Sequence, residues 1–399
     1  MLELPRRTVL LGAAALATTA RAQRTVDLAL PGGPSGRATS SAFPQKGEMI
    51  VQRTRPALLE TPMEVFDKHV FTPNDRFFVR WHWGDIPSAI DTAAFRLSVR
   101  GHVSKPLSLS LAELMTLPRI EYAAVNQCSG NSRGLFEPRV AGAQWRHGAM
   151  GNARWTGVRL KDVLELAGVK ASAVAVRFGG LDAPLVPDAP DYLKSLEIDH
   201  ALDGEVMLAF LQNGEALPLL NGFPLRLIVP GWFSTYWVKM LSDIEVLSAP
   251  DDNYWMAKAY RIPDTPGADV EPGATGFATK PITRMVPRSW ITSHADGARV
   301  RAGLPLSLGG IALGGDQGVA KVELSTDGGR SWRDARLGKD EGRYSFRRFD
   351  AELPPMSAGP VAVLARCTNT VGETQPLTAN WNHSGYLRSV VEPIRVVAA

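Results

Sequence analysis

The spacing of apolar residues along the chain predicts strands from about residue 95 onward. Phe95, Leu97 and Val99 alternate with polar positions, which is the period of a strand with one buried face. Residues 225–229 form an apolar run, interrupted only by Arg226, that ends at Pro230 and Gly231, as a buried strand does. We therefore expect a folded domain with much β-structure in this part of the chain.

Two short helices are also predicted. Ser110 and Glu113 have the spacing of a capping box, and Pro118 follows soon after, so a helix begins after Ser110 and stops before the proline. Apolar residues at 160, 163, 164 and 167 follow helical spacing. Gly168 then provides the C-terminal stop of that second helix.

The last 118 residues have a different pattern, with short alternating strands separated by turn signals. Val322 and Leu324 alternate with charged residues, and the sequence 327–329 (Asp-Gly-Gly) predicts a hairpin turn. This pattern favours an immunoglobulin-like sandwich over residues 282–399. Residues 263–281 are rich in proline and glycine and are interpreted as a linker.

Composition limits the class of protein. The chain has 399 residues, 45% hydrophobic and 21% charged, which suits two or three domains and excludes a disordered or collagen-like chain. The 37 glycines and 29 prolines favour a turn-rich fold over a helical bundle. A net charge of +4 gives no support to nucleic-acid binding.

The first 22 residues have the features of an export signal. Arg6 and Arg7 precede the apolar run 12–17, and residues 20–22 (Ala-Arg-Ala) form a cleavage site of small residues. The paired arginines favour the twin-arginine route, with an ordinary secretory signal as the alternative. We expect a periplasmic protein with no membrane span, whose residues 23–69 form an extended N-terminal arm.

The two cysteines, Cys128 and Cys367, have no CxxC partner and are interpreted as unpaired. There is no HExxH, no CxxCH and no GxGxxG, so zinc, covalent haem and dinucleotide sites have no support. Cys367 lies in the predicted strand 361–367 and is expected in the core. Cys128 is followed by small polar residues and then Arg133, which favours a thiolate, a soft metal ligand. A buried structural thiol is the alternative.

Several motifs in one order resemble the sulfite oxidase family of molybdenum enzymes, and within it the periplasmic sulfite dehydrogenases of bacteria. They are Phe78-Val79-Arg80-Trp81-His82, Asn126-Gln127-Cys128-Ser129-Gly130-Asn131-Ser132-Arg133, Trp145 with Gly148-Ala149 and Ala153-Arg154-Trp155, Gly180-Leu181-Asp182, Asn221-Gly222-Phe223-Pro224-Leu225-Arg226, Trp237-Val238-Lys239, and Tyr260-Arg261-Ile262-Pro263-Asp264. The resemblance covers residues 70 to 399. It implies an α+β molybdopterin-binding domain over 70–262, followed by the sandwich.

The resemblance also implies the roles of individual residues. Cys128 would bind molybdenum that is held by a pterin. Arg80, Arg133 and Tyr260 would be catalytic and, with Trp145, would bind the substrate. The cofactor would be held by Phe78, Val79, Arg80, Trp81, His82, Asp182, Asn221, Arg226, Trp237, Val238 and Lys239. Asn221 stands where animal members have a histidine.

The expected activity is periplasmic oxidation of sulfite to sulfate. We expect no haem in this chain, so electrons would pass to a c-type cytochrome, which could be a tight heterodimer subunit. The main alternative is a sulfane dehydrogenase that acts on carrier-bound sulfur. Two others are a methionine sulfoxide reductase, which would lack the sandwich, and a non-catalytic binding protein with a vestigial core. For several residues a simpler role stays open: stacking for Arg80, core packing for His82, Trp145 and Tyr260, and surface exposure for Lys239.

Overall fold

A computed structural model describes residues 24–399, so the predicted export signal over 1–22 lies outside the described residues. The described chain is mostly β, and its longest helix has eight residues, so the helical share is smaller than the expected α+β class suggests. The helices are α1 (Met63–Lys68), α2 (Leu111–Leu114), α3 (Leu160–Ala167), α4 (Ile198–Ala201) and α5 (Tyr254–Ala257). Single 3-10 turns are η1 (Asn74–Arg76), η2 (Arg133–Leu135), η3 (Leu219–Asn221), η4 (Ser234–Tyr236) and η5 (Pro266–Ala268). No helix in the described part of the chain has the length and apolar character needed to cross a bilayer.

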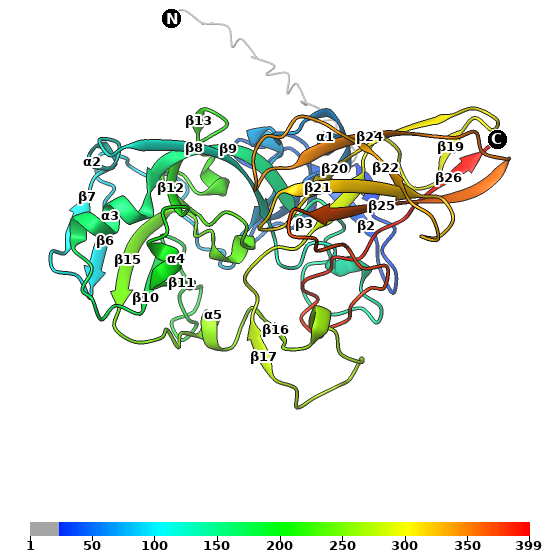
Figure 1. The fold of residues 1–399 in the computed structure, drawn as a ribbon. Helices are drawn as coiled ribbons and strands as arrows, with labels where there is room; N and C mark the ends of the chain where they lie inside the picture. The colour runs from blue at the N-terminus through cyan, green and yellow to red at the C-terminus, as the bar shows by residue number, and fades with distance from the viewer. Residues whose placement is uncertain (1–23) are drawn as a thin grey trace, which may run out of the picture.

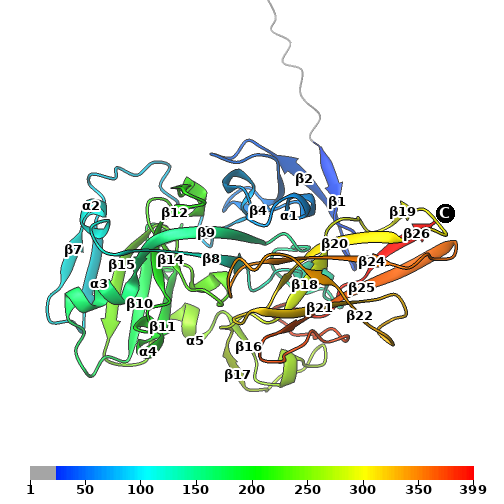
Figure 2. The same cartoon turned by 45° about the horizontal axis from the view of Figure 1, so that its top comes forward.

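The region expected to be an extended arm is folded. It supplies four strands, β1 (Thr25–Asp27), β2 (Gly36–Ser40), β3 (Met49–Arg53) and β4 (Leu58–Glu60), to a five-stranded sheet in chain order that β5 (Val79–Arg80) completes. The extended-arm prediction was therefore wrong, because Met49 and Leu59 are completely buried against Trp81 and give the sheet a core of its own. In Figure 2 these blue strands lie across the junction of the two larger domains.

The central domain contains two sheets with one large apolar core between them. One sheet has the order β11 (Leu193–Glu197), β10 (Ala175–Gly180), β15 (Leu241–Leu247), β6 (Leu97–Gly101) and β7 (Leu107–Leu109). The other has the order β13 (Glu215–Ala216), β12 (Met207–Gln212), β9 (Met150–Arg159) and β8 (Arg119–Gln127), with β14 (Arg226–Ile228) paired to β12. Figure 1 shows this domain on the left. The strands predicted near residues 95–99 and 225–229 are thus confirmed, as β6 and β14.

Both predicted helices are confirmed with their caps. At α2 the Ser110 hydroxyl accepts from the Glu113 amide and the Glu113 carboxylate accepts from the Ser110 amide, which is a complete capping box. At α3 the four apolar residues are buried, and Gly168 has φ 67°, a left-handed conformation that glycine adopts at little cost. Local sequence signals therefore determine where these helices begin and end.

The C-terminal domain is a sandwich of two sheets, seen on the right of Figure 1. One is β18 (Arg288–Ile291), β20 (Leu306–Leu313), β24 (Arg347–Leu353) and β23 (Arg336–Leu337); the other is β19 (Ala298–Val300), β26 (Ile394–Ala398), β25 (Gly359–Asn369), β21 (Val319–Ser325) and β22 (Arg333–Asp334). Strands β21 and β22 pair antiparallel around the predicted 327–329 turn. The immunoglobulin-like connectivity stays a prediction. Both cysteines are unpaired, as expected, and burial in the sandwich raises the pKa of Cys367 to about 12.

The two large domains pack directly against each other. The amide of Val125, on β8, donates to the carbonyl of Tyr344 at 2.8 Å, so a central strand pairs with the C-terminal domain. The two ends of the segment interpreted as a linker lie side by side, because β16 (Arg261–Pro263) pairs with β17 (Thr279–Pro281). Residues that follow the central domain therefore return to it, and the C-terminal domain can contribute to a shared site.

Candidate active site

Cys128 sits immediately after the end of β8. Its amide donates to the carbonyl of Ala149 at 2.9 Å, and its own carbonyl accepts from the Asn131 amide at 2.9 Å. The small polar residues after it form a tight turn, while β8 stays paired with β9 along its whole length. This turn is held by core strands, so the thiol, which is 6% exposed, has a fixed position at the wall of a cavity.

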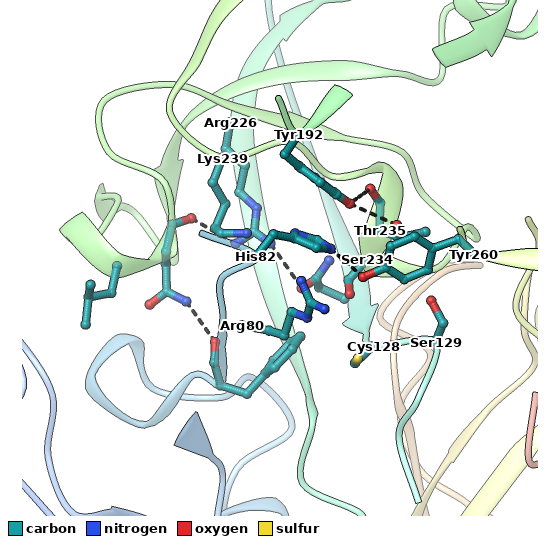
Figure 3. Close-up of a pocket in the computed structure, with 14 residues that line it drawn as sticks. Arg80, His82, Cys128, Ser129, Tyr192, Arg226, Ser234, Thr235, Lys239 and Tyr260 are labelled. Atoms are coloured by element: carbon teal, nitrogen blue, oxygen red, sulfur yellow. Dashed lines mark hydrogen bonds between the residues drawn. The ribbon is translucent and has the colours of Figure 1, made fainter. Parts of the chain in front are cut away.

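Eight of the predicted residues line one narrow cavity, whose empty space is about 410 Å³ when the part open to solvent is included. They are Phe78, Arg80, His82, Cys128, Asn221, Arg226, Lys239 and Tyr260. In Figure 3 the polar ends of Arg80, His82 and Tyr260 point toward one space beside Cys128. Arg80 lies on β5, Cys128 directly after β8, Arg226 on β14 and Tyr260 directly before β16. Segments up to 180 residues apart in the sequence thus meet at the predicted site.

A wider pocket, with about 1290 Å³ of empty space when the part open to solvent is included, adjoins this cavity and shares Arg80, His82, Cys128 and Tyr260 with it. The wider pocket adds Trp81, Arg133 and Trp145 from the predicted set. Cys128 therefore has a cavity with Arg226 and Lys239 on one side and a pocket with Arg133 on the other. Trp81, which was predicted to bind the cofactor, lines the wider pocket together with Arg133 and Trp145, which were predicted to bind the substrate.

Arg133 is enclosed by three glycines and by the C-terminal domain. A Cβ added at Gly130, Gly142 or Gly385 would lie 2.5 Å, 2.6 Å or 2.7 Å from atoms of the Arg133 side chain. Its Nε donates to the carbonyl of Ser384 at 3.2 Å, and its guanidinium carbon lies 5.0 Å from the centre of the Tyr386 ring. The sequence did not indicate that the sandwich domain completes this pocket.

Tyr260 and His82 form a hydrogen bond between the phenol oxygen and Nε2. Burial, with Arg80 and Lys239 nearby, holds the pKa of His82 well below its usual range, so the imidazole is neutral near pH 7. Burial also raises the pKa of Tyr260, so its hydroxyl remains protonated. Tyr260 has φ 54°, a left-handed conformation that turns the chain as the ring enters the pocket. The pair can therefore donate and relay a proton without carrying charge.

Arg80 provides fixed positive charge between the two spaces. Burial by itself lowers the pKa of Arg80, but the neighbouring Tyr260 and Cys128 outweigh it and leave the pKa raised. The guanidinium carbon lies 6.0 Å from the centre of the Tyr260 ring, and one terminal nitrogen is buried without a hydrogen-bond partner. A buried cation with a free donor is suited to an anion.

The deep end of the 410 Å³ cavity is also cationic. Arg226 donates to the Asn221 carbonyl at 2.9 Å and to Asn126 Oδ1 at 3.1 Å, and burial lowers its pKa to about 9. Lys239 is not a surface residue: its Nζ lies 4.4 Å from the centre of the Trp81 ring, and burial lowers its pKa to about 7. Lys46, which the sequence did not single out, bonds to Asn221 Oδ1 from the N-terminal sheet.

The residues present fit a bound pterin cofactor with an anionic end. Five buried side-chain atoms of the cavity have no hydrogen-bond partner: a terminal nitrogen of Arg80, Nδ1 of His82, Nδ2 of Asn126, Oγ of Ser129 and Nε of Arg226. All five can donate a hydrogen bond, which is the complement of carbonyl and phosphate oxygens. Within residues 24–399, no three His, Cys, Asp or Glu side chains lie together as a metal site. A metal at Cys128 would have to take its other ligands from the cofactor.

Four predicted cofactor residues line neither space. Val79 packs with Met49 and Leu59, while the Trp237 ring packs against Trp155 at 5.6 Å and Val238 is buried in the main core. Asp182 is buried near Lys239, and burial raises its pKa. The geometry therefore does not favour direct contact between these four side chains and a cofactor. They pack behind the residues that line the cavity and hold those residues in place.

Several lining residues were not predicted from the sequence. They are Asn126, Ser129, Tyr192, Leu220, Ser234 and Thr235. Asn126 and Ser129 flank Cys128, so proximity in the sequence could have indicated them. Tyr192 could not be found this way, because its ring reaches the site only by stacking on His82, with the ring centres 3.5 Å apart.

Lys194, a buried residue that the sequence analysis did not identify, predicts how the stability of the protein depends on pH. Its Nζ is buried 4.4 Å from the centre of the Tyr236 ring, and burial lowers its pKa to about 7. In the unfolded chain the amine keeps its proton up to about pH 10, whereas in the folded protein it loses the proton above about pH 7. Between these pH values the unfolded state binds more protons, so the free energy of unfolding increases as the pH rises. Relative to Lys194→Met, the wild type should gain about 2 kcal/mol in free energy of unfolding between pH 7 and 9.

Chemical denaturation of the cofactor-free protein at the two pH values measures this difference. Lys105→Met, at an exposed lysine, is the matched control and should show no pH-dependent difference from the wild type. Equal pH profiles for the wild type and Lys194→Met would contradict the prediction.

Comparison with known proteins agrees with the site. A family model described as an oxidoreductase molybdopterin binding domain matches residues 83–255, and one described as a Mo-co oxidoreductase dimerisation domain matches residues 279–396. With the cavity at Cys128, these matches define a molybdopterin oxidoreductase.

Full-length relatives identify the family more narrowly. The sulfite oxidase of Gallus gallus is 32% identical over 360 residues, covering 86% of this chain and 77% of that protein. The mitochondrial sulfite oxidase of Homo sapiens is 33% identical over 361 residues, 87% of this chain and 65% of that protein, so the chain spans about two thirds of the human relative. The chain belongs to the sulfite oxidase family of molybdenum enzymes.

A solved structure is similar over both domains. The crystal structure of the sulfane dehydrogenase SoxCD from Paracoccus pantotrophus matches with a TM-score of 0.72 and 26% identity, covering 85% of this chain and 84% of that one. The similarity therefore includes the catalytic domain and the sandwich together.

Proposed function

We propose that this protein oxidises sulfite to sulfate in the periplasm with a molybdenum–molybdopterin cofactor and passes the electrons to a c-type cytochrome. The observation that carries the proposal is the convergence of Cys128, Arg80 and Tyr260 where the two cavities meet. The family and its sulfite oxidase relatives support the substrate class. The periplasmic location follows from the predicted export signal, and the cytochrome from the need for an electron acceptor.

The roles of the residues follow from their positions. Arg226, Lys239 and the free donors of the deep cavity would hold the pterin and its phosphate, and Cys128 would bind the metal. When bound, the cofactor supplies the oxygen-transfer and two-electron chemistry that side chains lack. Arg80 and Arg133 would bind the anionic substrate from two sides of the pocket.

Tyr260 and His82 would handle protons. The neutral Tyr260 hydroxyl has one proton, which it can donate either to Nε2 of the neutral His82 or to a substrate oxygen. Trp145, completely buried at the pocket wall, would restrict the space around the substrate and exclude water. Sulfite and one water give sulfate, two protons and two electrons, so each turnover requires two one-electron acceptors.

The test is sulfite-dependent reduction of ferricyanide and of cytochrome c by purified protein, with molybdenum and pterin content measured on the same sample. About one molybdenum per chain together with turnover of free sulfite is the expected result. Protein from a cofactor-competent host that contains no molybdenum would overturn the proposal.

A second candidate is a sulfane dehydrogenase acting on carrier-bound sulfur, which the similarity to SoxCD favours. The two differ in their requirement for a carrier protein. Molybdenum in the protein, with turnover only when sulfur is presented on a carrier, would support this second activity and contradict the first.

A further inference from the structure

An apolar surface with an acidic border lies beside the active site. It is formed by residues 83–85, 183–191 and 252–255, and we call it the apolar–acidic surface. Leu185 and Val186 are 58% and 57% exposed, and Tyr254 is 50% exposed. These segments adjoin each other: Asp85 pairs with Ala183, and Trp255 Nε1 donates to the Pro190 carbonyl at 3.4 Å.

The border of this surface is negatively charged. Asp85, Asp188, Asp191 and Asp252 are all exposed, and within residues 24–399 none of them has an ion-pair partner. Lys258 lies at the pocket mouth, while the exposed Arg55 lies within the surface, since a Cβ added at Gly84 would be 3.1 Å from Arg55 Cγ and 3.6 Å from Leu185 Cδ1. Four carboxylates therefore surround one cation. Exposed apolar residues beside an excess of unpaired carboxylates are typical of a transient protein interface.

Contacting aromatic rings connect this surface with the active site. His82, which bonds to Tyr260, has its ring centre 5.0 Å from that of Trp255, and Trp255 is 5.1 Å from Tyr254. Trp83 also contacts Trp255, at 6.0 Å. The rate of electron tunnelling falls steeply with distance, so a carrier protein must dock close to the site. A carrier docked over Tyr254 would be close to it, because the contacting rings extend from His82 to the solvent-exposed Tyr254.

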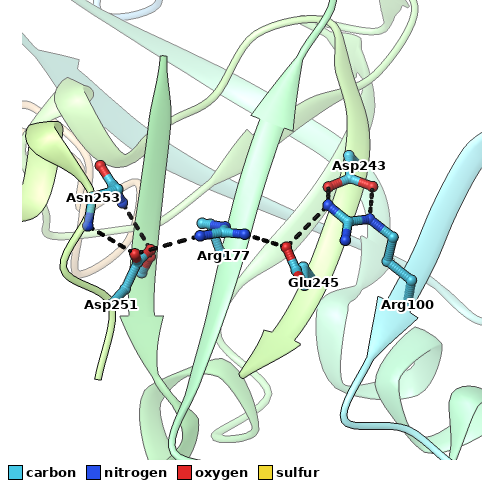
Figure 4. A network of polar contacts seen from close by, with 7 residues as sticks. Arg100, Arg177, Asp243, Glu245, Asp251 and Asn253 are labelled. Atoms are coloured by element: carbon cyan, nitrogen blue, oxygen red, sulfur yellow. Dashed lines mark hydrogen bonds and ion pairs between the residues drawn. The ribbon is translucent and has the colours of Figure 1, made fainter. Parts of the chain in front are cut away.

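The helix at the centre of this surface is firmly anchored (Figure 4). Asn253 caps α5 by accepting from the Trp255 amide at 2.8 Å, and its own side-chain amide donates to Asp251 at 2.7 Å. Asp251 then pairs with Arg177, the start of a chain of ion pairs that continues through Glu245 and Arg100 across the sheet. The carrier would therefore meet a preformed surface, which reduces the entropy cost of binding.

We propose that the apolar–acidic surface is the docking site for a basic one-electron carrier protein with its redox group near an exposed, lysine-rich edge. This inference rests on the proposed function, because each sulfite oxidised releases two electrons. Two carriers dock in succession, and each is reduced by one electron. The acidic border attracts the carrier and orients it, while the apolar centre gives close contact.

The test compares Asp188→Lys/Asp252→Lys with Asp334→Lys/Glu352→Lys, a control with the same charge change at exposed, unpaired carboxylates of the sandwich. A basic c-type cytochrome and ferricyanide serve as acceptors at low ionic strength. The first variant should lower kcat/KM for the cytochrome about ten-fold or more, and added salt should narrow the difference. The control should stay within about two-fold. Sulfite turnover with ferricyanide should be unchanged in both, because a small oxidant does not need the surface.

Binding of the oxidised cytochrome, measured by calorimetry without sulfite, tests the docking surface separately from the proposed oxidation of sulfite. Weaker binding to Asp188→Lys/Asp252→Lys alone supports the docking surface even if sulfite is not the substrate. Equal binding and equal cytochrome kinetics for wild type and both variants would overturn the docking surface, although ferricyanide turnover would still support sulfite oxidation. If the wild-type protein did not reduce ferricyanide with sulfite, the proposed function would be overturned instead.

Discussion

Cys128→Ser is expected to lower sulfite turnover by at least about 100-fold. Replacing a residue that only orients a metal ligand typically lowers activity by about 10- to 100-fold, and loss of the ligand itself should lower it further. The Cys128 thiol is the soft ligand at the cavity, and a serine hydroxyl has nearly the same size but binds molybdenum poorly. The main-chain hydrogen bonds of the turn would remain, so the fold should be kept. Steady-state turnover with ferricyanide measures the loss, and the part of the visible absorption that comes from the bond between the Cys128 sulfur and the metal should disappear from the spectrum.

The second cysteine provides the control. Cys367→Ala changes a thiol that is completely buried in the sandwich, far along the chain from the site. It should lower the thermal midpoint slightly through lost packing and leave sulfite turnover and the absorption spectrum unchanged. If Cys128→Ser retained wild-type turnover and spectrum, Cys128 would not be the metal ligand.

Arg80→Gln is expected to lower kcat/KM for sulfite by about 10- to 100-fold, mainly through a higher KM. Arg80 is a buried cation with an unpartnered donor, and a charge-assisted hydrogen bond to an anion contributes about 1.5–3 kcal/mol. Glutamine keeps a donor but removes the charge. Ferricyanide-linked kinetics over a range of sulfite concentrations measures the change, and molybdenum content is determined on the same samples.

Arg301→Gln, at an exposed arginine of the sandwich, is the control and should match the wild type. An unchanged KM for sulfite in Arg80→Gln, with full molybdenum content, would exclude Arg80 from substrate binding. A loss of molybdenum would instead indicate that Arg80 holds the cofactor, the second of its predicted roles.

Local features were predictable because neighbouring residues determine them. The capping box at Ser110, the glycine stop at Gly168 and the 327–329 hairpin depend on a few adjacent positions and were all predicted correctly. The N-terminal arm was not, because polar and small residues gave a weak strand pattern. Its strands are stabilised by Met49 and Leu59 packing on Trp81, a contact between distant segments.

The same distinction holds for the site. The sequence by itself determined the motif around Cys128, the cationic residues Arg80 and Arg226 and the unpaired state of both cysteines. Only the tertiary structure decided that Tyr192 stacks on His82, that Lys46 reaches Asn221 from the N-terminal sheet, and that Ser384 and Tyr386 hold Arg133 from the sandwich domain.

The physical reason is that residue type specifies what chemistry a side chain can perform, and local sequence specifies the turn or strand that carries it. Burial, charge neighbours and shared cavities arise only when segments far apart in the chain pack together. The lowered pKa of Lys239 and the free donors around Cys128 are properties of that packing.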